Sequence, residues 1–100
     1  MKRIALAALI VLLFTLPGWT AHSVTLQWNP SATPNVVYHV WRHYNSTFPP
    51  KPYANAGIDL TYTDANVMPG QTYYYWVTAY NKARGESAPD GPTVVQIPKD

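Results

Sequence analysis

The sequence predicts an all-β protein built as one antiparallel β-sandwich. Short runs of alternating apolar residues recur along the chain, and Pro, Gly, Asn and Asp separate them. No stretch carries the apolar spacing of an amphipathic helix. Many short strands at this spacing are typical of a sandwich. Behind a predicted leader, about 79 residues remain, which is enough for one small domain.

The first predicted element is a secretory signal peptide over residues 1–21. A basic pair, Lys2 and Arg3, precedes an apolar run over residues 4–16, and a Pro-Gly pair ends that run. A basic start, a short apolar stretch and a small-residue exit are typical of export signals. The run is shorter than the roughly 20 residues that span a bilayer. An uncleaved membrane anchor is the alternative.

The cleavage point has three partial matches to the small-residue pattern, after Thr20, after Ala21 and after Ser23. We expect the mature chain to start near Ala21 or His22, so that the domain covers residues 22–100. The predicted location is therefore secreted or periplasmic, with only transient membrane contact through the signal peptide.

Charge and cysteine content exclude several classes of function. Without Lys2 and Arg3, five basic residues stand against five acidic ones, and such a neutral domain offers no electrostatic surface for nucleic acid. The chain contains no cysteine. It therefore has no disulfide, no thiolate metal site and no cysteine nucleophile.

The strands behind the leader are predicted from period-two alternation and from the turn residues between them. In the first of them Val24, Leu26 and Trp28 share one face. A turn-rich connection over residues 81–92 precedes the last strand. The predicted strands cover residues 23–28, 36–43, 53–58, 60–66, 71–81 and 93–98.

Five segments in order resemble the fibronectin type III family. They are Val24-Thr-Leu-Gln-Trp28, Tyr38-His-Val40, Val67-Met-Pro-Gly-Gln-Thr-Tyr73, Tyr75-Trp-Val-Thr-Ala-Tyr-Asn81 and Gly85-Glu-Ser-Ala-Pro89. The resemblance covers residues 23–98 and implies an immunoglobulin-like antiparallel sandwich of the fibronectin type III kind.

One feature of the family has no counterpart in the mature chain. The family has a strand before the one that matches Val24 to Trp28, and here only the leader precedes it. The resemblance therefore implies that the first strand is missing after cleavage. The strand from Val24 to Trp28 would then have an unpaired edge that can accept a partner strand.

The resemblance also assigns faces to the strand over residues 71–81. It places Tyr73, Tyr75, Val77 and Ala79 inside and gives Tyr73 a tyrosine corner, in which the hydroxyl bonds to upstream backbone. The remaining expected core residues are Leu26, Trp28, Tyr38, Val40, Val95 and Ile97, with Tyr62 as a further candidate from the opposing sheet.

The opposite faces of two neighbouring strands would carry a band of aromatic and imidazole side chains. One interpretation is cross-strand pairing, which stabilises a sheet by a few tenths to about 1 kcal/mol per pair. The other is a binding face, because exposed contiguous aromatic surface often marks a partner site. The six candidate residues are His39, Trp41, His43, Tyr74, Trp76 and Tyr80.

No arrangement of residues predicts catalysis, a cofactor or a metal. His39 and His43 share a strand face but stand about 13 Å apart, too far to bind one ion. Asp59 and Asp64 flank a strand and are interpreted as turn residues. We predict a non-catalytic extracytoplasmic binding or adhesion module with an unidentified protein or glycan partner, monomeric or weakly self-associating. The alternatives are a carbohydrate-binding accessory module and a spacer or assembly subunit that pairs through its open edge.

Overall fold

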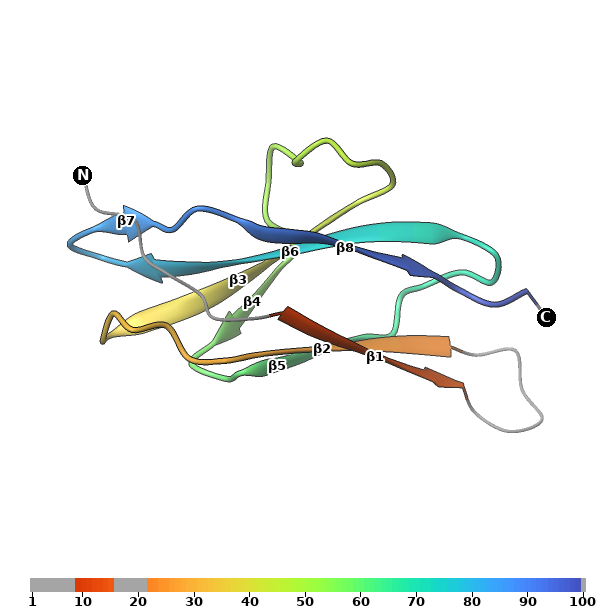
Figure 1. Cartoon of the computed structure of the whole chain (residues 1–100), viewed down its shortest axis with the longest axis horizontal. Coiled ribbons are helices and arrows are strands. Elements are labelled where there is room, and N and C mark those ends of the chain that lie inside the picture. The colour runs from red at the N-terminus through yellow and green to blue at the C-terminus, as the bar shows by residue number, and fades with distance from the viewer. Residues whose placement is uncertain (1–8, 16–21, 100) are drawn as a thin grey trace.

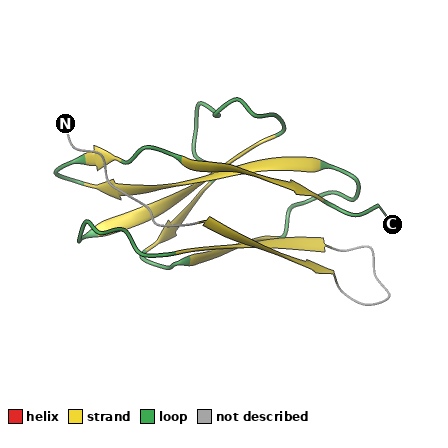
Figure 2. Cartoon of the chain, viewed as in Figure 1, coloured by secondary structure: helices red, strands yellow, loops and turns green. Residues whose placement is uncertain are grey.

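The computed structural model describes residues 9–15 and 22–99, and within these the chain forms strands, loops and turns but no helix (Figure 2). The strands are β1 (Leu9–Thr15), β2 (His22–Trp28), β3 (Val36–His43), β4 (Ala54–Gly57), β5 (Thr61–Asp64), β6 (Thr72–Asn81), β7 (Gly85–Glu86) and β8 (Asp90–Gln96). The all-β prediction is confirmed.

The strands form two sheets that lie one over the other (Figure 1). The smaller sheet has the order β1-β2-β5, and the larger has the order β4-β3-β6-β7, with β8 also paired to β6. All the pairings are antiparallel. The loop between β3 and β4 rises from the larger sheet on the side away from the smaller one (Figure 1).

A strand does precede β2 in the uncleaved chain, so that the expected loss of the first strand depends on cleavage of the leader. Strand β1 lies beside β2 and pairs with it in unbroken register, from Leu9 opposite Trp28 to Thr15 opposite His22. These residues belong to the apolar run predicted as a signal peptide, and apolar aliphatic residues suit a strand as well as a leader. Residues 1–8 and 16–21, with the expected cleavage points at Thr20 and Ala21, lie outside the described residues.

The other strands lie where the alternation predicts them, within two residues at most ends. The larger difference concerns residues 81–92, because this connection contains β7 and the first residues of β8. Gly85 and Gly91 have φ of 84° and 132°, which side-chain-bearing residues rarely adopt. The two glycines therefore let the chain turn sharply while it stays paired with β6.

The core between the sheets contains the predicted residues. Tyr73, Tyr75, Val77 and Ala79 of β6 are each at most 1% exposed. The core also includes Val67, which the sequence analysis did not assign, and Tyr62 packs against it while partly buried. The Tyr73 hydroxyl accepts a hydrogen bond from the Met68 N–H at 2.9 Å, which confirms the tyrosine corner. The predicted core residues from other strands are also buried, namely Val24, Leu26, Trp28, Tyr38, Val40, Val95 and Ile97.

Candidate functional site

The register between β3 and β6 sets which side chains share the outer face, the face of the larger sheet turned away from the smaller sheet. Trp41 lies opposite Trp76, and His43 lies opposite Tyr74. Residues directly opposite in an antiparallel pair point to the same side. None of these four belongs to the core between the sheets. The predicted direction of the aromatic band is therefore confirmed.

The two tryptophans of this band are buried, contrary to the expectation of an open surface. Trp41 is 9% exposed and Trp76 is 3% exposed. Phe48 of the β3–β4 loop covers both, with its ring centroid 4.5 Å from that of Trp41 and 5.4 Å from that of Trp76. Together these rings form a second small apolar cluster on the outer face. Trp41 and Trp76 therefore support the sheet and the loop, and a ligand cannot reach most of their surface.

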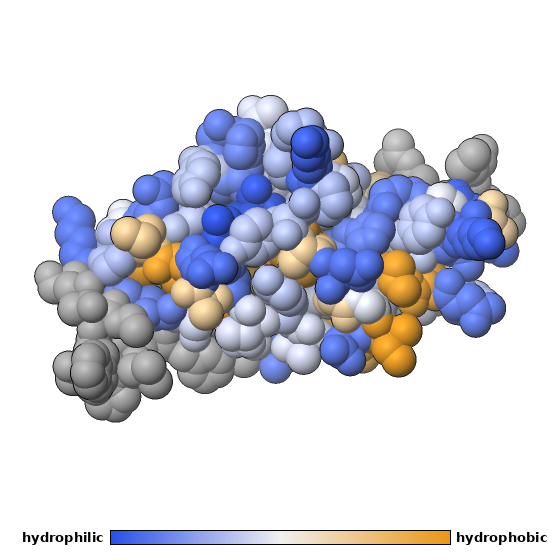
Figure 3. Space-filling view, turned by 180° about the vertical axis from the view of Figure 1, so that it is seen from behind, coloured by the Kyte–Doolittle hydropathy of each residue, from blue (hydrophilic) through white to orange (hydrophobic). Residues whose placement is uncertain are grey.

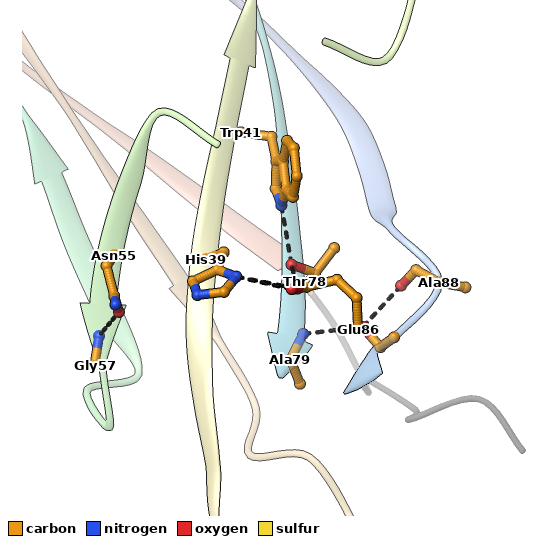
Figure 4. Close-up of polar contacts among 9 residues, drawn as sticks. His39, Trp41, Asn55, Gly57, Thr78, Ala79, Glu86 and Ala88 are labelled. Atoms are coloured by element: carbon orange, nitrogen blue, oxygen red, sulfur yellow. Dashed lines mark hydrogen bonds and ion pairs between the residues drawn. The ribbon is translucent and has the colours of Figure 1, made fainter. Parts of the chain in front are cut away.

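A chain of hydrogen bonds links Trp41 and His39 of the band to β6 and β7, as Figure 4 shows. The Trp41 indole N–H donates to Thr78 Oγ1 at 2.9 Å, and the Thr78 hydroxyl donates to Glu86 Oε2. His39 Nδ1 lies 3.0 Å from Glu86 Oε1, and the His39 ring stacks on Tyr80 at 5.8 Å. Glu86 thus joins β3, β6 and β7 through its carboxylate, a role that sequence reasoning missed.

Two areas of the outer face remain open to a partner. One is the Tyr80 ring, which is 37% exposed beside His39. The other, here called the outer patch, consists of Phe48, Tyr74 and Val94. Tyr74 stands opposite Val94 of β8, and Phe48 and Val94 are 39% and 55% exposed. Figure 3 shows, on the side seen from behind, a mostly hydrophilic surface with hydrophobic residues in separate small areas.

A charged cluster lies at one end of the core, and its centre is Asp64, which accepts the N–H two residues on as a turn residue does but also binds side chains of the other sheet. Asp64 is 1% exposed, and its carboxylate accepts four hydrogen bonds. Tyr75 and Arg42 donate to Oδ2 at 2.7 and 2.9 Å. The Tyr53 hydroxyl and the Asn66 N–H donate to Oδ1 at 2.9 and 3.0 Å. Both carboxylate oxygens are thus fully used, and the group is structural.

Ionisation in this cluster follows from burial and from these hydrogen bonds. Burial alone would raise the pKa of Asp64, but the bonds from Tyr75, Tyr53, Arg42 and backbone outweigh it, so that the pKa is lowered. Burial, together with the bond to Asp64, raises the pKa of Tyr53 to about 12. The same two causes raise the pKa of Tyr75. At neutral pH the pair of Asp64 and Arg42 is therefore charged, and both phenols are protonated.

Arg42 was missed although its position carries a signal. It follows Tyr38 and Val40 at a spacing of two, so that all three lie on the inner face of β3. Its guanidinium carbon lies 4.0 Å from the centroid of the Tyr53 ring and 4.8 Å from that of Tyr73, within reach of cation–π attraction. An arginine at an inward position predicts a buried carboxylate partner.

The described part of the chain has no cluster of metal-ligand side chains, and the hydroxyl of its Ser87 is engaged within the fold. It contains no group of three or more His, Asp or Glu residues that could hold a metal ion. Ser87 is buried, and its hydroxyl accepts from the Ala79 N–H and donates to the Ala88 carbonyl. No helix among these residues is long and apolar enough to cross a membrane.

The chain is similar to known proteins over most of its length. An Fn3-like protein from Clostridium thermocellum is 27% identical with a TM-score of 0.77, over 98% of this chain and 97% of that one. The fibronectin type III domain of the human fibronectin type III domain containing protein 3 is 28% identical with a TM-score of 0.64, over 86% and 82% of the two chains.

A curated relative is much longer than this chain. An amylopullulanase from Thermoanaerobacter thermohydrosulfuricus is 30% identical over 88 residues, and the match covers 81% of this chain and 6% of the relative. No model of a protein family matches the sequence. Its sheet order, its tyrosine corner and these solved structures agree, and the chain has the fold of fibronectin type III domains.

Proposed function

We propose that this domain is a non-catalytic module that works outside the cytoplasm and binds a partner protein through the outer patch, Phe48, Tyr74 and Val94. Export is supported by the leader pattern of residues 1–21, with its basic pair and its short apolar run. The non-catalytic part of the proposal is supported by Glu86, Thr78 and Ser87, whose polar groups already serve hydrogen bonds within the fold.

The outer patch is the observation that carries this proposal. Two aromatic side chains and one aliphatic side chain from the β3–β4 loop, β6 and β8 gather on one face, and two of them are more than a third exposed. The Phe48 ring packs on Trp41 and Trp76, and the backbones of Tyr74 and Val94 are held by the pairing of β6 with β8. Fixed apolar and aromatic side chains lose little conformational freedom on binding and are common anchors of protein interfaces.

Partner capture with matched variants tests the proposal. The full chain is produced in an exporting host, and extracytoplasmic extract is passed over it. The double variant Tyr74→Ser/Val94→Ser should weaken capture about tenfold or more, which corresponds to ~1.4 kcal/mol. The control Ile58→Ser/Met68→Ser removes two exposed apolar side chains, at 80% and 66% exposure, from loops outside the larger sheet. Equal capture by both variants would refute the outer patch as the contact surface.

A second candidate function is carbohydrate binding, and the match to a carbohydrate enzyme, the amylopullulanase, favours it. Its site would be the exposed Tyr80 ring, which His39 supports by stacking and which lies opposite Glu86 in the β6–β7 pairing. The exposed ring can stack on a sugar face, and the neighbouring carboxylate can accept hydrogen bonds from the sugar hydroxyls.

Tryptophan fluorescence can report sugar binding beside Tyr80, because the Trp41 indole is hydrogen-bonded to Thr78 and Thr78 to Glu86. Titration with a panel of oligosaccharides should change the emission of the wild type, and Tyr80→Ala should abolish the change. The outer-patch variant Tyr74→Ser/Val94→Ser serves as the control and should respond like the wild type. No response across the panel would exclude the second candidate and leave the first untouched.

A further inference from the structure

Strand β2 is central in the smaller sheet only as long as β1 stays beside it. The sheet order is β1-β2-β5, and β1 pairs with all seven residues of β2 without a register shift. The residues of β1 are also part of the predicted leader. If export removes or displaces them, one whole edge of β2 loses its hydrogen-bonding neighbour. The inference that follows rests on this part of the proposed function.

The sequence of β2, His-Ser-Val-Thr-Leu-Gln-Trp, contains none of the features that protect sheet edges. It has no lysine, arginine or acidic residue and no proline. Its pairings with β1 and with β5 contain no bulge. Natural edge strands are usually short, charged, bulged or interrupted by proline, because a free regular edge accepts another strand. Strand β2 is instead built as a strand with neighbours on both sides.

The pattern of β2 is also self-complementary. Val24, Leu26 and Trp28 face the core at 0%, 0% and 4% exposure, and the residues between them face outward. In an antiparallel pair of two β2 strands centred on Thr25, Val24 of one copy lies opposite Leu26 of the other. A register shifted by one residue would place core residues opposite outward ones. Among the registers that keep the faces matched, the one centred on Thr25 pairs all seven residues.

We propose that, once β1 leaves β2, the β2 strands of two copies pair antiparallel about a two-fold axis at Thr25. The smaller sheets of the two copies then join into one continuous sheet, in which each β2 has β5 on one side and the other β2 on the other. A two-fold axis requires this antiparallel arrangement and makes the contact closed, so that a dimer forms and not a filament. The outer face of the larger sheet stays free for a partner.

The first test uses the full chain and does not depend on export. Val11→Pro/Leu12→Pro in the middle of β1 should release β2, because one of two adjacent residues directs its N–H to the neighbouring strand and proline has none. Light scattering should give a monomer for the wild type and twice that mass for the proline variant. A folded proline variant that stays monomeric at all concentrations, or a wild type that dimerises equally, would overturn the proposal.

Charge at the two-fold axis distinguishes this register from unspecific association. Thr25 and Thr63 face outward on adjacent strands and share a hydrogen bond of 2.9 Å. Thr25→Lys in the proline variant places like charges opposite each other on the axis and should restore the monomer. Thr63→Lys breaks the same hydrogen bond but lies on β5, one strand away from the dimer contact, and should leave the dimer intact. Equal effects of the two lysines would contradict the register.

A crosslink decides the question if the proline variant does not fold. The chain has no cysteine, so that Thr25→Cys introduces a single thiol. Opposite residues in an antiparallel pair have Cα atoms about 4.5–5.5 Å apart, within reach of a disulfide. Exported, processed Thr25→Cys should form a disulfide dimer. Gln27→Cys should not, because its two copies would stand about 13 Å apart. Crosslinking at both positions or at neither would refute the proposed dimer.

Discussion

The Tyr75 hydroxyl donates a hydrogen bond of 2.7 Å to Asp64 Oδ2 and so joins the two sheets across the core. Asp64 ends β5 in the smaller sheet, and Tyr75 lies on β6 in the larger one. Both are at most 1% exposed. Because Arg42 donates to the same oxygen, the ionised carboxylate fixes the distance between the sheets by charge as well as by packing.

We expect Asp64→Asn to lower the free energy of unfolding at pH 7 by about 3–5 kcal/mol, as measured by urea denaturation. An asparagine keeps one acceptor oxygen, but its amide N–H₂ group would face groups that themselves donate hydrogen bonds to Asp64. The guanidinium of Arg42 would also lose its buried counter-charge. Asp59→Asn is the control, since Asp59 is exposed and should change stability by less than about 0.5 kcal/mol. A loss under about 1 kcal/mol at Asp64 would mean that the cluster contributes little.

Acid should destabilise the wild type through the same group. The pKa of Asp64 is lower in the folded state than the ordinary value of 3.8. Its contribution to stability is therefore fully present above pH 3.8 and is lost as the pH falls through the folded pKa. We expect unfolding free energies measured at descending pH to fall more steeply for the wild type than for Asp64→Asn. Parallel pH profiles of the two proteins would contradict the assignment.

The pairing of Arg42 with Asp64 is a part of the structure that the sequence did not predict. The alternation of apolar residues was enough to place six of the eight strands approximately, all but β1 and β7, and to separate the inner from the outer face of β6. The side-chain partners of Asp64 lie 11 and 22 residues away, and Tyr75 and Arg42 meet it only when the two sheets pack. An aspartate at the end of a strand looks like a turn residue until that packing is known.

The burial of Trp41 and Trp76 was not predicted for a related reason. The faces of β3 and β6 follow from alternation, and His39, Trp41 and Tyr74 of the predicted band do share one face. The loop that places Phe48 over the tryptophans has no periodicity from which its path could be predicted. Strand β1 was missed because a short apolar run preceded by basic residues fits both a leader and a strand.

Substitution of Phe48 tests whether this residue protects the tryptophans. Phe48→Ala should shift tryptophan emission to longer wavelength, because Trp41 and Trp76 gain contact with water, and should lower stability by about 1–2 kcal/mol. Tyr44→Ala is the matched control, since Tyr44 belongs to the same loop but lies against Tyr73, 5.6 Å between centroids. An unchanged emission maximum in Phe48→Ala would show that other groups cover the indoles.

Gly91 is expected to be the glycine least tolerant of substitution. A Cβ atom there would lie 2.6 Å from the Tyr75 carbonyl oxygen and 3.1 Å from Trp76 Cδ1, and φ is 132°. Gly91→Ala should therefore cost about 2–5 kcal/mol from overlap and backbone strain together. Gly57→Ala, at φ 62° with no atom within 4 Å of the added Cβ, should cost only about 1–2 kcal/mol from strain. Equal thermal shifts in the two variants would contradict the close approach at Gly91.

The tyrosine corner can be weighed against a second phenol that makes the same kind of bond. Tyr73 accepts from the Met68 N–H at 2.9 Å, and Tyr38 accepts from the Ser31 N–H at 2.8 Å. The segment at Met68 is anchored by Val67, which is 8% exposed in the core, whereas the loop at Ser31 is largely exposed. Water can replace a lost acceptor in the exposed loop more easily than beside the core.

We therefore expect Tyr73→Phe to cost about 1–2 kcal/mol and Tyr38→Phe about half of that, measured by urea denaturation at neutral pH. Amide hydrogen exchange should locate the difference, with faster exchange at Met68 in the first variant and at Ser31 in the second. If Tyr38→Phe is the more damaging change, the hydroxyl of Tyr73 is not what ties the β5–β6 connection to the sandwich, and packing of Val67 carries that role.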